Sequence, residues 1–193
     1  MTPDCLKYIE EHAAGLSGCV LEVGSRDLNG SPRSFFSDRM RFPSYTGIDL
    51  EDGPGVDDVR DCHHLGISGD IFDIVIDAER LEHDTDFFAS YREIFRVLKP
   101  GGHVITTARS WGGFHPHCLP NDYWRFLEDG LRRLLTVSGF EVLDLRYGDF
   151  WKAERNCGDT GGCVEHPEGG IHHDTFAHAI YSTARKPQRG ESR

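Results

Sequence analysis

The sequence lacks any long hydrophobic segment. No uninterrupted run of apolar residues exceeds three, as in Ile74-Val75-Ile76, whereas a transmembrane helix needs about 20 apolar residues. The N-terminus, Met1-Thr2-Pro3-Asp4, has neither a basic start nor an apolar stretch behind it. We therefore predict no membrane span and no signal peptide, and we expect a cytoplasmic location.

Positive charge is also scarce. Lys and Arg together number 21 against 32 Asp and Glu, which gives a formal net charge of −11 at pH 7. Nucleic-acid-binding proteins gain much of their affinity from Lys and Arg on phosphates, so this balance argues against a nucleic-acid partner. It favours small molecules, sugars or peptides. The sequence predicts no membrane partner and leaves the oligomeric state open.

Cysteines are present but do not form an obvious framework. The chain has six: Cys5, Cys19, Cys62, Cys118, Cys157 and Cys163. Without a secretory signal, and in a chain larger than most disulfide scaffolds, we interpret most of them as reduced thiols.

A Gly-rich loop, 156–174, holds Cys157 and Cys163 together with His166, His172 and His173. The five residues between the two thiols are more than zinc motifs usually have. We predict no metal here and favour a surface loop or a polar lid over the substrate, with metal binding and a disulfide as alternatives.

The rest of the composition is that of a folded domain. The chain has 193 residues, of which 38% are apolar and 11% aromatic. This length predicts one domain, which we place at 1–185, followed by a flexible tail at 186–193.

Hydrophobic patterning predicts that strands and helices alternate. Strands are expected at 19–24, 45–50, 56–60, 71–77, 103–108, 139–145 and 176–184, and helices at 2–16, 31–40, 88–98 and 121–138. The near-continuous apolar run at 71–77 is typical of a central parallel strand covered on both faces. The pattern predicts an α/β fold with a doubly wound, mostly parallel sheet of about seven strands and an antiparallel edge strand.

Two helices carry more detailed predictions. Ser31 and Pro32 suit the cap and first turn of the helix at 31–40. Phe88, Tyr91, Phe95 and Leu98 form a stripe at helical spacing, and Pro100-Gly101-Gly102 is expected to stop that helix.

Polar residues and glycines follow the predicted strands at the edge where ligands bind in such sheets. A Gly-rich turn, 22–30, ends the first strand, and Asp49 ends the second. A carboxylate at that place can accept hydrogen bonds from both ribose hydroxyls of an adenosine cofactor. Asp61 can accept from the adenine amine, while the backbone N–H of Cys62 faces a ring nitrogen. The alternatives are structural: a simple connection, a strand-end turn at Asp49 and a helix cap at Asp61.

Five segments, in this order, resemble the class I S-adenosylmethionine-dependent methyltransferases of the small, single-domain, type 11-like kind. They are residues 20–25, 45–50, 61–62, 72–77 with 81–83, and 97–102. The resemblance covers about residues 18–145. It implies a Rossmann-like methyltransferase fold, transferase activity and S-adenosyl-L-methionine as cofactor.

The resemblance also implies roles for single residues. The cofactor-binding set consists of Glu22, Gly24, Ser25, Arg26, Asp49, Leu50, Asp61, Cys62, Asp77 and Ala78. Glu22 and Gly24 would shape the floor under the methionine half of the cofactor. Asp49 would hold the ribose, Asp61 and Cys62 the adenine, and Asp77 with Ala78 the methionine end.

Two positions depart from the family pattern. Arg26 stands where the family often has a second glycine, and it is a candidate partner for the cofactor carboxylate. Glu79-Arg80 replaces a more apolar sequence that we expect after the fourth strand.

The acceptor side is predicted at 111–126, which follows the fifth strand and resembles a His, Pro, Asp-Tyr-Trp-Arg-Phe segment of some relatives of the family. Histidine titrates near neutral pH, so His115 and His117 are the predicted catalytic bases for an acceptor hydroxyl. An amine acceptor would need no base. In the structural alternative, Asn121 or Asp122 caps the next helix, Trp124 and Phe126 pack in the core, and Arg125 pairs with an acid.

The predicted function is methyl transfer to an oxygen or nitrogen of a small-molecule, sugar or peptide acceptor. Two other functions stay open. One is a non-catalytic binding or partner module that keeps the cofactor fold. The other is a nicotinamide-dependent oxidoreductase, against which the missing three-glycine fingerprint argues.

Overall fold

The computed structural model describes residues 1–38, 40–112, 121–156 and 171–191, and the side chains of 149–156 and 171–176 lie outside this description. The helices are α1 (Pro3–Ala13), η1 (Pro32–Ser37), η2 (Leu81–His83), α2 (Phe87–Val97) and α3 (Glu128–Val137), where η denotes a 3₁₀ helix. The strands are β1 (Val20–Val23), β2 (Tyr45–Asp49), β3 (Asp58–Val59), β4 (Phe72–Ala78), β5 (Leu98–Arg109), β6 (Glu141–Asn156) and β7 (Ile171–Arg185).

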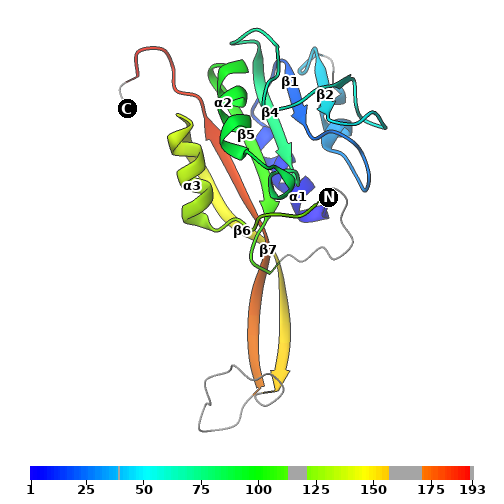
Figure 1. The fold of residues 1–193 in the computed structure, drawn as a ribbon, viewed down its shortest axis with the longest axis vertical. Coiled ribbons are helices and arrows are strands. Elements are labelled where there is room, and N and C mark those ends of the chain that lie inside the picture. The colour runs from blue at the N-terminus through cyan, green and yellow to red at the C-terminus, as the bar shows by residue number, and fades with distance from the viewer. Residues whose placement is uncertain (39, 113–120, 157–170, 192–193) are drawn as a thin grey trace.

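The seven strands form one sheet in the order β3-β2-β1-β4-β5-β7-β6 (Figure 1). Strands β1 to β5 pair in parallel, whereas β7 runs antiparallel to both of its neighbours, β5 and β6. The predicted α/β fold is therefore confirmed, and the antiparallel strand lies second from the edge of the sheet.

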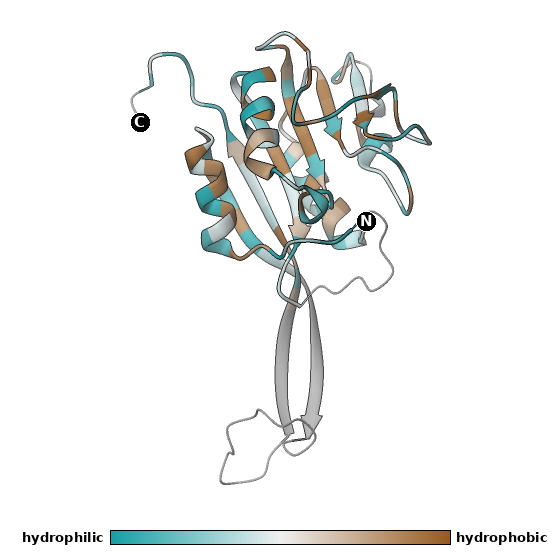
Figure 2. Ribbon diagram, viewed as in Figure 1, coloured by the Kyte–Doolittle hydropathy of each residue, from teal (hydrophilic) through white to brown (hydrophobic). Residues whose placement is uncertain are grey.

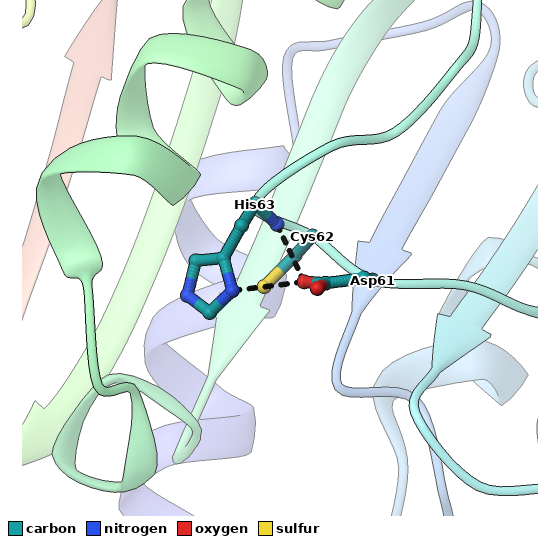
Figure 3. A group of neighbouring side chains, drawn as sticks. All are labelled: Asp61, Cys62 and His63. Carbon is teal, nitrogen blue, oxygen red and sulfur yellow. Dashed lines mark hydrogen bonds and ion pairs between the residues drawn. The ribbon is translucent and has the colours of Figure 1, made fainter.

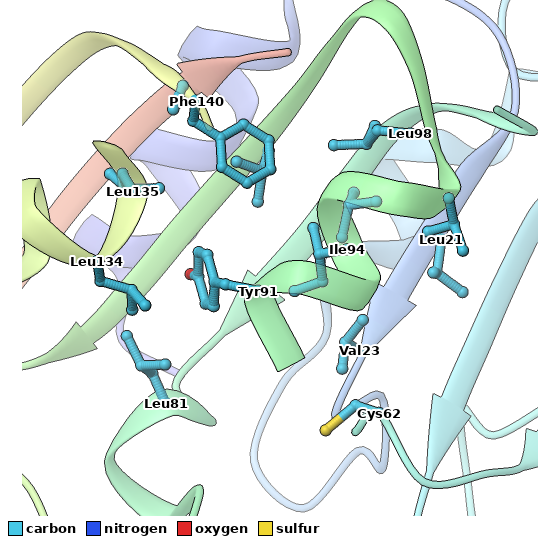
Figure 4. Close-up of a cluster of buried hydrophobic side chains, with 14 of the residues drawn as sticks. Leu21, Val23, Cys62, Leu81, Tyr91, Ile94, Leu98, Leu134, Leu135 and Phe140 are labelled. Atoms are coloured by element: carbon cyan, nitrogen blue, oxygen red, sulfur yellow. The ribbon is translucent and has the colours of Figure 1, made fainter. Parts of the chain in front are cut away.

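Helices cover both faces of the sheet, because the central strand β4 buries side chains on both sides. Val75 belongs to the core that α2 and α3 complete, part of which Figure 4 draws. Ile74 and Ile76 belong to a second core, with residues of α1 and η1. Figure 2 shows hydrophobic and hydrophilic residues alternating around α2 and α3, as expected for helices with one buried face.

The helix predicted at 31–40 is a shorter 3₁₀ helix, η1. Ser31 caps it as predicted, since its hydroxyl accepts a hydrogen bond from the backbone N–H of Arg33 at 3.2 Å. Pro32 occupies its first turn. This short element contributes Phe36 to the core under β1 and β2.

The stripe predicted on α2 is partly wrong. Tyr91 and Leu98 are buried as predicted, but Phe88 is 42% exposed, and Ile94 and Val97 complete the buried face. The helix ends at Val97 and β5 begins at the next residue, so the predicted stop at 100–102 lies inside the strand. At the start of the helix, the Asp86 side chain acts as the cap by accepting a hydrogen bond from the N–H of Ala89 at 3.0 Å.

The helix predicted at 121–138 is also too long, because α3 begins only at Glu128. Residues before it donate backbone hydrogen bonds to neighbouring elements instead. The N–H groups of Tyr123 and Trp124 reach the carbonyl of Glu82 at 2.8 and 3.1 Å. These tertiary bonds compete with helix formation and override the local pattern.

Strands β6 and β7 extend beyond the rest of the sheet. Strand β5 pairs with β7 as far as Arg109 opposite Ala179, whereas β6 and β7 stay paired to Asn156 opposite Ile171. The two strands project from the body as a long ribbon (Figure 1).

The predictions for the Gly-rich loop and for the C-terminal tail are only partly covered by the described residues. Cys157, Cys163 and His166 of the Gly-rich loop lie outside the described residues, as do the side chains of His172 and His173. At the start of the predicted tail, the Lys186 ammonium donates to Asp70 at 2.7 Å. The flexibility of the tail stays a prediction. No helix among the described residues is long and apolar enough to cross a membrane.

Candidate functional site

The carboxyl ends of three neighbouring strands meet at one edge of the sheet. Val23 pairs with Ile48 of β2 on one side and with Asp77 of β4 on the other. Gly24, Asp49 and Asp77 therefore lie at the same edge, as the sequence predicted for a cofactor site. In doubly wound sheets, ligands bind at this edge.

The turn after β1 is pinned onto β2. Gly24 has a φ of +74°, a conformation that favours glycine. The N–H groups of Gly24 and Ser25 both donate to the carbonyl of Ile48, at 2.9 and 3.0 Å. The N–H of Arg26 donates to the Asp49 carboxylate at 3.1 Å. These bonds hold the backbone of the turn beside Asp49.

Asp49 keeps the capacity to bind hydroxyl groups. One of its oxygens accepts from Arg26, and the other accepts from the N–H of Glu51 at 3.2 Å. A carboxylate offers about four lone-pair sites, so sites remain for two ribose hydroxyls. Leu50 is 65% exposed beside it, and the Arg26 guanidinium pairs with the Glu51 carboxylate. The residues present fit the ribose of an adenosine cofactor.

Glu22 is a buried carboxyl group at the end of β1. Its side chain accepts a hydrogen bond from the Tyr45 hydroxyl at 2.7 Å. Burial raises the pKa of Glu22 to about 7, although the Tyr45 hydrogen bond and the charge of Arg33 oppose the shift. The neighbouring Ser25 hydroxyl is buried and has no hydrogen-bond partner among the described residues.

The predicted adenine contacts, Asp61 and Cys62, lie in a turn with His63 (Figure 3). Asp61 accepts from the backbone N–H of His63 at 2.8 Å and pairs with its ring Nδ1 at 2.9 Å. No helix begins here, so the alternative of a helix cap at Asp61 is wrong.

The side chains of Asp61, Cys62 and His63 bring three potential metal-ligand atoms within 4.8 Å of one another. The Cys62 sulfur, however, lies 3.3 Å from the Ser90 hydroxyl and 3.5 Å from an Arg80 nitrogen. Burial raises the pKa of the Cys62 thiol, whereas metal binding requires the thiolate. These contacts favour a hydrogen-bonded turn over a metal centre.

Arg80 connects the residues predicted for the methionine end of the cofactor. Its guanidinium donates to both oxygens of Asp77, at 2.7 and 2.8 Å. A third nitrogen donates to Asp84 at 2.5 Å. Burial alone would raise the pKa of Asp84, but Arg80 and two hydrogen-bond donors, Ser90 and His63, outweigh it and lower the pKa to about 2.

A second buried group of charges, which sequence reasoning missed, follows Ala78 at the ends of β4 and β5. The guanidinium of Arg109 lies 2.5 Å from Glu79 and 3.8 Å from Glu82. Burial, followed by the charge of Glu79, raises the pKa of Glu82 to about 8. Glu79 has a φ of +53°, which is uncommon for a residue with a side chain. The sequence signal that could have revealed this group is Glu79-Arg80, which replaces the more apolar sequence expected after the fourth strand.

Residues 121–126 of the predicted acceptor segment lie beside η2, which follows β4. His115 and His117 lie outside the described residues, so their role stays a prediction. From residue 121 onward, the segment contacts η2, and the Trp124 indole N–H donates to the carbonyl of Asp84 at 2.8 Å. The structural alternative is partly confirmed, because Phe126 is buried and Arg125 pairs with Asp122. Trp124 is 44% exposed, however, and neither Asn121 nor Asp122 caps α3.

Comparisons with known proteins show similarity to methyltransferases. The methyltransferase domain family matches residues 30–106. A curated relative, phthiotriol/phenolphthiotriol dimycocerosates methyltransferase 1 of Mycobacterium ulcerans, is 32% identical over 100 residues, which are 46% of this chain and 36% of the relative. The chain thus spans only about a third of the curated relatives it matches.

Solved structures share the fold at low sequence identity. The Burkholderia thailandensis 1,6-didemethyltoxoflavin-N1-methyltransferase, solved with bound 1,6-didemethyltoxoflavin and S-adenosylhomocysteine, has a TM-score of 0.61 and 19% identity, covering 96% of this chain and 78% of that one. The [4+2]-cyclase SpnF has a TM-score of 0.65 and 19% identity, covering 96% and 80%.

The fold, the order of the strand-end segments and the matched domain family point the same way. The chain is similar to the methyltransferase domain family over residues 30–106, and solved methyltransferases share its fold.

Proposed function

We propose that the protein transfers the methyl group of S-adenosylmethionine to an oxygen or nitrogen of a small-molecule, sugar or peptide acceptor. One observation carries this proposal: the β1, β2 and β4 register aligns Gly24, Asp49 and Asp77 at the edge where ligands bind. When bound, the cofactor supplies a methyl group on a positively charged sulfur.

The protein's own residues would bind and orient the reactants. Asp49 would accept the ribose hydroxyls, and Asp61 the adenine amine. Displacement at a methyl carbon needs an in-line approach of the acceptor, so holding both reactants in place supplies much of the rate. His115 or His117 would take the proton of a hydroxyl acceptor.

Cofactor binding is the first test. Saturating S-adenosylmethionine or S-adenosylhomocysteine should raise the melting temperature of the protein, because a ligand that binds only the folded state stabilises it. No shift with either compound would contradict the proposal.

Asp49 supplies the residue-level test. Hydrogen bonds to charged groups contribute about 1.5–3 kcal/mol, so Asp49→Ala should weaken S-adenosylhomocysteine binding by about ten- to a hundred-fold. Asp52→Ala is the matched control, since Asp52 lies on the same loop and accepts the N–H of Gly53. Unchanged affinity in a folded Asp49→Ala protein would make Asp49 a turn residue only.

A non-catalytic module is the second candidate. The side chain of Arg80 packs on Gly24, the floor of the predicted cofactor site, so a protein that keeps the fold without transferring a methyl group is the alternative to test. The [4+2]-cyclase with the same fold is further reason to test turnover directly. Cofactor binding without methyl transfer to any acceptor class would support this candidate.

A further inference from the structure

The Arg80–Asp77 ion pair lies inside the predicted cofactor site. The Asp77 side chain is fully buried, and only 12% of the Arg80 side chain is exposed. A Cβ atom placed on Gly24 would lie 2.8 Å from Cγ and 2.9 Å from Cδ of Arg80. The pair therefore lies directly on the turn where the methionine end of the cofactor is expected.

Stability alone is a weak reason for such a pair. Removing two charges from water is expensive, and hydrophobic residues of similar volume often replace a buried ion pair without loss. The resemblance also leads us to expect a more apolar sequence at Glu79-Arg80. A buried Arg and Asp at the ligand edge of the sheet thus call for another explanation.

The surroundings allow Arg80 to change partners. Asp84, which also accepts from Arg80, has two further partners: the Ser90 hydroxyl at 2.5 Å and the His63 ring at 2.6 Å. Rotation of Arg80 would leave Asp84 with both. Asp77, by contrast, forms an ion pair with Arg80 and with no other cation among the described residues.

The amino-acid end of S-adenosylmethionine carries one ammonium and one carboxylate. It is therefore complementary to an ion pair that opens. We propose that the Arg80–Asp77 pair is the receptor for this end: Arg80 releases Asp77 and binds the carboxylate, and Asp77 binds the ammonium. Two ion pairs then replace one, and no buried charge is left without a partner.

This inference rests on the proposed function and deepens it. It also assigns the carboxylate to Arg80 in place of Arg26, whose guanidinium pairs with Glu51 on the acidic loop after β2. Arg26 thus supplies the rival assignment that an experiment must separate.

Two ligands make the test. S-adenosylhomocysteine carries the amino-acid end, whereas 5′-methylthioadenosine keeps the adenine, ribose and sulfur but lacks it. We expect calorimetric titration of the full chain to show S-adenosylhomocysteine binding at least about tenfold more tightly, the magnitude of one charge-assisted contact. Equal affinities of the wild-type protein would overturn the inference without any variant.

The variants locate the effect. The double variant Asp77→Asn with Arg80→Met removes both charges, so it leaves no unpaired charge buried. It should lose most of the preference for S-adenosylhomocysteine while keeping its affinity for 5′-methylthioadenosine. Arg80→Lys, which keeps the charge but not the paired geometry, should retain part of the preference.

Arg96→Met is the matched control. Like Arg80, Arg96 pairs with a carboxylate three residues earlier, Glu93, at 2.7 Å. It lies at the opposite end of β4 from the predicted site, since its backbone carbonyl accepts a hydrogen bond from the N–H of Asp70. The Arg96→Met variant should show the same preference for S-adenosylhomocysteine over 5′-methylthioadenosine as the wild type. Loss of the preference in Arg26→Met but not in the double variant would assign the carboxylate to Arg26.

The remaining outcomes are also distinct. Tighter binding of S-adenosylhomocysteine by the double variant would mean that Arg80 only obstructs the site, and the inference would be wrong. If the wild type binds neither ligand, the proposed function fails and takes the inference with it. Binding of both ligands with no effect of the double variant overturns the inference alone.

Discussion

The two ends of the β1–β4 strand pair contain the same three kinds of residue in different environments. At the amino end, Gly18 has a φ of +114° and lies against Asp73, which pairs with Lys99 at 2.8 Å. At the carboxyl end, Gly24 lies against Arg80, which pairs with Asp77. Each end thus combines a glycine in the left-handed region with an acid and a cation.

The ends differ in burial and in backbone contacts. The Lys99 and Asp73 side chains are 42% and 30% exposed, and Asp73 also accepts the backbone N–H of Cys19 at 2.8 Å. The Asp77 side chain is fully buried, and the Arg80 guanidinium donates to both of its oxygens. At the amino end, a partly exposed acid links Lys99 to the backbone of Cys19. At the carboxyl end, the charges are buried where a ligand is expected to bind.

Removing the cation at each end should give the largest contrast. Arg80→Met leaves Asp77 buried and unpaired, and breaking a buried pair in this way destabilises proteins by about 3–5 kcal/mol. Lys99→Met breaks a partly exposed pair, typically worth about 0–1 kcal/mol. Urea unfolding of both variants measures the two losses. Similar losses would contradict the comparison.

The pH dependence of stability should sharpen the contrast next. Because the pKa of Glu22 is raised to about 7 in the folded protein, its contribution is fully present below the ordinary pKa of 4.5 and is lost as the pH rises through about 7. Wild-type stability should therefore fall relative to Glu22→Gln over this range, by at most about 1.4 kcal/mol per pH unit.

Chemical unfolding of the wild type and of Glu22→Gln between pH 4.5 and 8 checks this prediction. The difference between the two proteins isolates Glu22, since every other titrating group is common to both. A constant difference across the range would show that the Glu22 pKa is not raised.

The two glycines should give the smallest and most specific contrast. Alanine at Gly18 or Gly24 has to adopt a left-handed conformation, which costs about 1–2 kcal/mol. We expect both variants to lose at least this much stability in thermal or urea unfolding, because the added Cβ would also clash with Asp73 Oδ2 or lie 2.8 Å from Arg80 Cγ. Only Gly24→Ala should also weaken S-adenosylhomocysteine binding. Equal affinities of the two variants would show that Gly24 is not part of the cofactor site.

Much of the fold was predictable because its signals are local. The apolar run around Ile74–Ile76 predicted the central strand, and the helix patterns predicted cover on both faces. The limits of α2 and α3 were not predictable. The segment before α3 has a helical pattern, but Glu82 and Arg109 accept hydrogen bonds from its backbone, and these partners come from distant parts of the sequence.

The candidate site divides in the same way. Gly24 follows a recognisable strand, and Asp49 and Asp77 lie at the carboxyl ends of theirs, so the sequence alone determined that they reach one edge of a parallel sheet. Only the tertiary structure decided which charges pair there and which carboxyl groups have a raised pKa. Arg80 meets Asp77 and Asp84, and Glu22 has a raised pKa, because burial and the approach of separate segments govern charge interactions, and neither can be read from residue order.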